Sequence, residues 1–117
     1  LIQSPAYPQT DEALAERLRF SMRRAYHPAG MFRQMLAIGA DTERPALLAR
    51  IQCPTLVLHG EPDALVPIAC GQDTARRIPG AQFVPIPGMG HDLPPEVCAI
   101  LARHIVPFLN ATPSRHP

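Results

Sequence analysis

The sequence predicts an α/β fold in which two parallel strands and their flanking helices form part of a larger doubly wound, mostly parallel sheet. Residues 55–58 are an unbroken apolar run without in/out alternation, which is typical of a strand covered on both faces. A second extended segment, residues 82–86, follows a helical stretch, so that the strand–helix–strand order favours parallel pairing. Because isolated two-stranded units are rarely stable, these strands are expected to belong to a larger sheet.

Three helices are predicted in the first fifty residues. Thr10 can cap a helix that begins at Asp11, and Pro28 separates this helix from a second one at residues 29–40. A third, short helix is expected within residues 41–50. The second helix is apolar around most of its circumference, so other structure should cover it. Core packing is the favoured explanation, and a lid that lines an apolar substrate site is the alternative; the side chains concerned are Met31, Phe32, Met35, Leu36 and Ile38.

The second half of the chain alternates strands and helices. After the strand at residues 55–58, a helix is expected from Pro67 to Arg77. Pro85 lies inside the next strand and cannot donate a ladder hydrogen bond, which predicts a strand at the edge of the sheet. The last helix should start near Pro94 and bury one face, formed by Val97, Leu101, Ile105 and Phe108.

Composition narrows the class of protein. A hydrophobic content of 46% and a charged content of 18% are typical of a globular protein. The net charge of +1, with arginines scattered along the chain, predicts neither a nucleic-acid nor a membrane partner. The cysteines, Cys53, Cys70 and Cys98, are odd in number and lack zinc-type spacing, so we interpret them as free thiols of a cytoplasmic protein.

Two loops carry the residues with catalytic potential, because each leaves the carboxyl end of a predicted strand, where α/β sheets gather their ligands. Asp63 projects from the first loop, and His91 lies in the second, directly after a turn bracketed by Gly88 and Gly90. An acid and a base on neighbouring loops would make two thirds of a catalytic triad. Glu61 is the competing acid, whereas Asp92 is interpreted as a residue at the start of the last helix and His59 as a histidine satisfied at the strand end.

The segments Pro54-Thr55-Leu56-Val57-Leu58-His59-Gly60-Glu61-Pro62-Asp63 and Ile86-Pro87-Gly88-Met89-Gly90-His91 resemble the late strands of α/β-hydrolases. The whole stretch is similar to esterases related to aclacinomycin methylesterase. The resemblance implies that Asp63 is the triad acid and His91 the general base. It implies no metal and no organic cofactor.

The family's nucleophile is not found in this sequence. Members carry Gly-x-Ser-x-Gly upstream of the acid, and Ser4, Ser21 and Ser114 all lack that context. Cys70 follows the acid and is in the wrong order to replace the serine. The first residue is not Met, so we expect that an upstream part is missing.

The expected organisation is the end of a helical cap at residues 1–45, the C-terminal part of the hydrolase core at residues 46–110, and a disordered tail at residues 111–117. The expected function is that of the C-terminal portion of a serine hydrolase acting on a small carboxylic ester, inactive without its nucleophile. Two alternatives stay open. One is a haloalkane dehalogenase or epoxide hydrolase with an Asp nucleophile, and the other is a non-catalytic domain that forms homo-oligomers through an exposed sheet edge.

Overall fold

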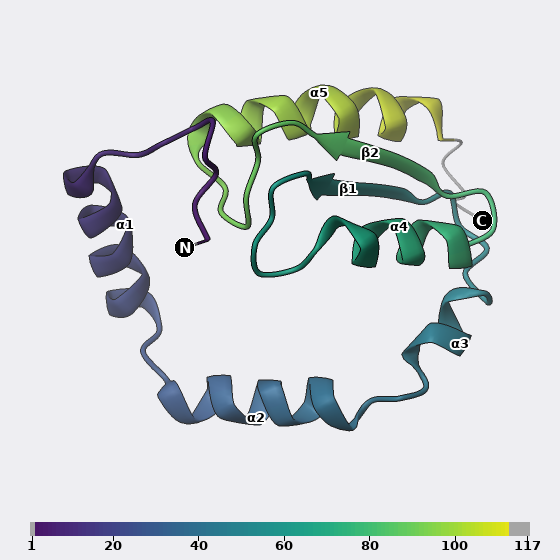
Figure 1. The fold of residues 1–117 in the computed structure, drawn as a ribbon, viewed down its shortest axis with the longest axis horizontal. Coiled ribbons are helices and arrows are strands. Elements are labelled where there is room, and N and C mark those ends of the chain that lie inside the picture. Colours follow the sequence, from purple (N-terminus) through teal and green to yellow (C-terminus); the bar gives the residue numbers. More distant parts are fainter. Residues whose placement is uncertain (1, 113–117) are drawn as a thin grey trace.

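A computed structural model describes residues 2–112 and has the predicted mixture of helices and parallel strands (Figure 1). The elements in chain order are α1 (Asp11–Arg24), α2 (Pro28–Ala40), α3 (Arg44–Leu48), β1 (Leu56–Gly60), α4 (Ile68–Arg77), β2 (Gln82–Ile86) and α5 (Pro95–Ala111). The predicted α/β class is therefore confirmed. Ala111 belongs to α5 and not to a tail, and residues 113–117 of the predicted tail lie outside the described residues.

The two strands form a parallel pair whose carboxyl ends point in the same direction (Figure 1). Their register runs from Leu56 opposite Gln82 to Gly60 opposite Ile86. Pro85 stands opposite His59, and within residues 2–112 β2 pairs with β1 alone. Helix α4 makes the crossover between the strands, and Figure 1 shows α4 and α5 on opposite sides of the pair.

The buried core of the described residues is small. Its apolar members are Ile78, Ile86 and Val97, which lie in or beside the α4–β2–α5 unit. Val97 is fully buried as predicted, but Ile105, assigned to the same buried face, is 38% exposed. Strand β1 is likewise only half-buried along most of its length. Two strands and two helices offer too little surface to cover these faces completely.

The first helices begin and end close to the predicted residues. The Thr10 hydroxyl accepts a hydrogen bond from the Ala13 amide at 3.2 Å, which confirms the predicted cap of α1. Helix α3 is shorter than the expected 41–50 because residues 41–43 are used as its lead-in: Asp41 accepts a hydrogen bond from the Arg44 amide at 3.2 Å.

Helix α2 lies away from the strand pair, in an arc formed by α1, α2 and α3 (Figure 1). All five of its large apolar side chains, Met31, Phe32, Met35, Leu36 and Ile38, are between 55% and 70% exposed. The favoured prediction that they pack in a core is therefore wrong within residues 2–112. Helix α2 packs against no other helix or strand among these residues, and the large side chains Phe20 and Leu47 of the neighbouring helices are also exposed. No helix among these residues has the length and hydropathy to cross a membrane.

Candidate active site

Gly60 allows the two loops at the carboxyl ends of the strands to meet. It is buried at the end of β1, and a Cβ atom placed there would collide with the backbone carbonyl of Met89 and lie 2.9 Å from the carbonyl oxygen of Gly90. The Glu61 amide then donates a hydrogen bond to the carbonyl of Ile86 at 3.1 Å. The loop that carries Asp63 is thereby held directly against the loop that carries His91.

The side chains of Asp63 and His91 are joined by a hydrogen bond. The distance between His91 Nδ1 and Asp63 Oδ2 is 2.8 Å. The other carboxylate oxygen of Asp63, Oδ1, accepts hydrogen bonds from the amides of Leu65 and Val66, each at 2.9 Å. The loop backbone therefore fixes one oxygen of the carboxylate and turns the other towards the imidazole.

The surroundings of Asp63 keep its carboxylate ionised. Burial alone would raise the pKa of Asp63, but hydrogen bonds from the Val66 amide, from His91 and from the Leu65 amide outweigh burial and lower this pKa below its usual value. An ionised carboxylate can only accept hydrogen bonds, so Nδ1 of His91 carries the proton. The lone pair of the opposite nitrogen, Nε2, is then free to take up a proton.

The two side chains differ in exposure. The Asp63 side chain is 6% exposed and the His91 side chain is 41% exposed. A buried acid behind an accessible imidazole can hold that ring in one orientation and stabilise its protonated form. Such a pair has the chemical means to act as an acid and a base in proton transfer.

Comparison with known proteins gives the family. Residues 20–112 match an α/β-hydrolase family described as "TAP-like protein". The chain belongs to the α/β-hydrolase family. Over 74 residues, which are 61% of this chain and 30% of the relative, it is 35% identical to a pimeloyl-[acyl-carrier protein] methyl ester esterase of Aromatoleum aromaticum. The narrower resemblance to aclacinomycin methylesterase stays a prediction.

Solved structures agree on the fold. A thermophilic esterase from Thermogutta terrifontis is 41% identical with a TM-score of 0.52, over 56% of this chain and 24% of the esterase. A serine hydrolase involved in carbazole degradation, the CarC enzyme, superposes with a TM-score of 0.72 over 93% of this chain and 43% of that enzyme, at 22% identity. The α/β-hydrolase chain described here thus spans less than half the length of these relatives.

Glu61, the competing acid of this α/β-hydrolase, is exposed, and its backbone amide is the group that binds the neighbouring loop. The carboxylate that bonds to His91 is that of Asp63. His59 is partly buried near the strand end, where its Nε2 lies 2.8 Å from the carbonyl oxygen of Val66 and 3.9 Å from Asp63 Oδ2. Its role is therefore to hold the Asp63 loop in place, as its interpretation as a satisfied histidine requires.

Replacing Gly71 by alanine is expected to lower the free energy of unfolding by about 1–3 kcal/mol, because a Cβ atom there would meet the ring of His59 at 2.5 Å. The matched control is Gly39→Ala, also in a helix, where a Cβ atom meets nothing within 4 Å. This control is expected to raise the free energy of unfolding by roughly 0.5–1 kcal/mol. Urea unfolding of both variants measures the difference, and equal stabilities would contradict the tight packing at His59.

Asp92 was predicted to lie at the start of the last helix, and this prediction is wrong. Helix α5 begins at Pro95, and Asp92 is a buried residue that accepts hydrogen bonds from the amide and the hydroxyl of Ser4, each at 2.6 Å. Pro94, and not an acidic residue, precedes the helix. Nothing in the spacing of the sequence connects residues 4 and 92, so sequence reasoning missed the pair.

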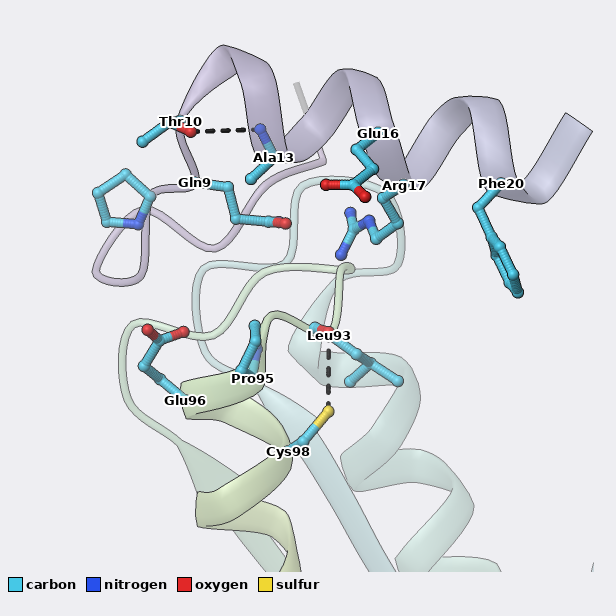
Figure 2. Close-up of a pocket in the computed structure, with 11 residues that line it drawn as sticks. Gln9, Thr10, Ala13, Glu16, Arg17, Phe20, Leu93, Pro95, Glu96 and Cys98 are labelled. Atoms are coloured by element: carbon cyan, nitrogen blue, oxygen red, sulfur yellow. Dashed lines mark hydrogen bonds between the residues drawn. The ribbon is translucent and has the colours of Figure 1, made fainter.

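A cleft of about 660 Å³ lies between α1 and the start of α5 (Figure 2). Phe20, Leu93 and Cys98 give it an apolar lining, and Glu16 and Arg17 point into it from α1. Asp63 and His91 are not among its lining residues, although Leu93 follows His91 by two positions. Within residues 2–112, no three His, Cys, Asp or Glu side chains are grouped so that they could hold a metal ion.

The serines described by the structure do not meet the needs of a nucleophile at His91. The Ser4 hydroxyl is buried and bonded to Asp92 and to the Gly90 amide. Ser21 lies on the exposed surface of α1. Ser114 lies outside the described residues. The Asp63–His91 pair therefore has no serine partner among residues 2–112.

Proposed function

We propose that this chain supplies the acid, Asp63, and the general base, His91, of a serine carboxylesterase. The observation that carries the proposal is the hydrogen bond of 2.8 Å between His91 Nδ1 and Asp63 Oδ2, with the acid buried and the base accessible. Two relatives above 30% identity are named as esterases, which favours ester hydrolysis over the dehalogenase and epoxide hydrolase alternatives. The nucleophile would come from a part of the protein that precedes these residues.

The proposed reaction uses His91 twice. In acylation, Nε2 takes the proton of the serine hydroxyl as its oxygen attacks the ester carbonyl, and Asp63 stabilises the resulting imidazolium. The tetrahedral intermediate collapses when the C–O bond to the alcohol breaks and the leaving oxygen receives the proton from Nε2. In deacylation, His91 activates a water molecule in the same way, so that the carboxylic acid is released and the serine is restored.

The proposed substrate is a small carboxylic ester, and the proposed location is the cytoplasm. The three cysteines support a reducing compartment, because all are free and exposed. Without a nucleophile or an oxyanion hole, the 117-residue chain is expected to be inactive by itself.

Intact-mass analysis after fluorophosphonate treatment tests the proposal. We expect the product of the full open reading frame to gain one adduct and the 117-residue chain to gain none, because fluorophosphonates react with activated serines far faster than with other side chains. A long product that stays unlabelled under native conditions would contradict the serine mechanism. An Asp nucleophile or a non-catalytic, self-associating domain would then take its place.

A further inference from the structure

The N-terminal segment lies directly against the loop that carries His91. The His91 amide donates a hydrogen bond to the carbonyl of Ile2 at 2.9 Å, and the Ala6 amide donates one to the carbonyl of Gly88 at 3.2 Å. Residues 2–6 therefore run along the histidine loop with main-chain hydrogen bonds at both ends. The backbone of the proposed base is held by a segment that lies more than eighty positions away in the sequence.

Ser4 stands at the centre of this contact and is fully buried. Its hydroxyl accepts a hydrogen bond from the Gly90 amide at 2.9 Å and donates one to Asp92 Oδ1 at 2.6 Å. The Ser4 amide donates a second hydrogen bond to the same oxygen at 2.6 Å. One serine thus binds the residue before His91 and the residue after it.

The other oxygen of Asp92 is bonded to residues near the start of α1. Gln9 Nε2 donates to Asp92 Oδ2 at 2.9 Å, and the Arg17 guanidinium lies 3.8 Å from the same oxygen. Burial by itself would raise the pKa of Asp92, but the hydrogen bonds from Ser4 and the charge of Arg17 lower this pKa. The carboxylate therefore stays ionised, and every buried side-chain nitrogen or oxygen among residues 2–112 has a hydrogen-bond partner.

We propose that Ser4 and Asp92 are positioning residues that hold the imidazole of His91 in line with Asp63. The inference rests on the proposed function, in which His91 moves a proton in each half of the reaction. A displacement of about 1 Å of a catalytic group can cost on the order of 100-fold in rate. The residues on either side of His91, Gly90 and Asp92, are both bonded to the buried Ser4 hydroxyl. Loss of this hydroxyl therefore allows the imidazole to rotate away from Asp63.

The test compares Ser4→Ala and Asp92→Asn with two controls in the product of the full open reading frame. Ser21→Ala removes an exposed hydroxyl of α1, and Asp73→Asn removes a carboxylate of α4 that pairs with Arg77. We expect kcat to fall by about 10- to 100-fold in the first two variants, with KM unchanged, and to stay constant in the controls. The double variant Ser4→Ala/Asp92→Asn should lose no more than the more severe single variant, because both changes break one contact.

Two readouts separate positioning from a merely structural role. The acid limb of the profile of kcat/KM against pH should move to lower pH in Ser4→Ala and Asp92→Asn, because a misaligned Asp63 stabilises the imidazolium less. In proton NMR of the same proteins, the resonance of the His91 Nδ1 proton should be lost or broadened in both variants and kept in both controls. If Ser4→Ala does not fold, Asp92→Asn, which retains the shape of the side chain, decides alone.

The inference is overturned if the pH profile and the Nδ1 proton resonance of both variants match those of the controls, whatever the effect on stability. Failure of the proposed function gives a different result. In that case Asp63→Asn and His91→Ala would themselves retain turnover, and the NMR measurement would still decide whether Ser4 and Asp92 orient the imidazole.

Discussion

Replacing His91 by alanine is expected to lower kcat of the full open reading frame product by about 10⁵- to 10⁶-fold, with a much smaller effect on KM. The reason is that Nε2 of His91 is the group proposed to take the proton from the nucleophile and to return it to the leaving alcohol. Hydrolysis of a nitrophenyl ester of a short acid measures the effect. Labelling by a fluorophosphonate should be lost in parallel, since the serine is no longer activated.

The control for this experiment is His104→Ala, which removes an exposed histidine from the interior of α5. Turnover of this control should equal that of the parent protein. A His91→Ala variant that keeps more than a tenth of the parent activity would remove His91 from the mechanism, and with it the proposed function.

Replacing Asp63 by asparagine is expected to lower kcat by about 10⁴-fold. The asparagine oxygen is needed to accept the hydrogen bonds from the Leu65 and Val66 amides, so the NH2 group replaces Oδ2 and donates to His91 Nδ1. The ring then adopts the tautomer in which Nε2 carries the proton, and Nε2 cannot act as a base. The measurement is the same ester hydrolysis. Glu61→Gln, which changes the neighbouring exposed acid, should leave kcat within about twofold of the parent value. If Glu61→Gln abolishes turnover and Asp63→Asn does not, Glu61 is the acid of the site and the assignment of Asp63 is wrong.

Asp63→Asn is also expected to change how the stability of the protein depends on pH. Because hydrogen bonds hold the folded-state pKa of Asp63 below its usual value, the ionised carboxylate stabilises the fold above about pH 4, and this contribution is lost as the pH falls through the folded-state pKa. The difference in free energy of unfolding between the parent and Asp63→Asn should therefore be largest at neutral pH and shrink below pH 4. Urea unfolding at a series of pH values measures it.

The sequence was sufficient for those parts of the molecule whose cause is local or topological. The βαβ order places both strand ends at one edge, and this places Asp63 and His91 on adjacent loops before any contact is known. Thr10 and the proline at position 28 similarly determine where helices begin. The local chemistry of these residues does not depend on the rest of the fold.

Other features depend on contacts that a linear pattern does not contain. The apolar circumference of α2 predicted burial, yet burial is decided by what packs against a helix, and within residues 2–112 nothing covers it. Ser4 has no motif around it, and its structural importance comes from its hydrogen bond to Asp92, which lies 88 positions later. An aspartate that follows a loop histidine has no signature in the sequence that separates it from one at a helix start.

The arc of α1, α2 and α3 is attached to the α/β unit at both of its ends. Ser4 binds Asp92 before the arc begins, and α3, the last helix of the arc, packs against α4. A segment that is closed at two fixed points can change in length at small entropic cost, since each doubling costs only about 0.6 kcal/mol. Homologous proteins could therefore exchange or lengthen this segment, and with it the exposed apolar surface of α2, without relocating the carboxylate and the imidazole.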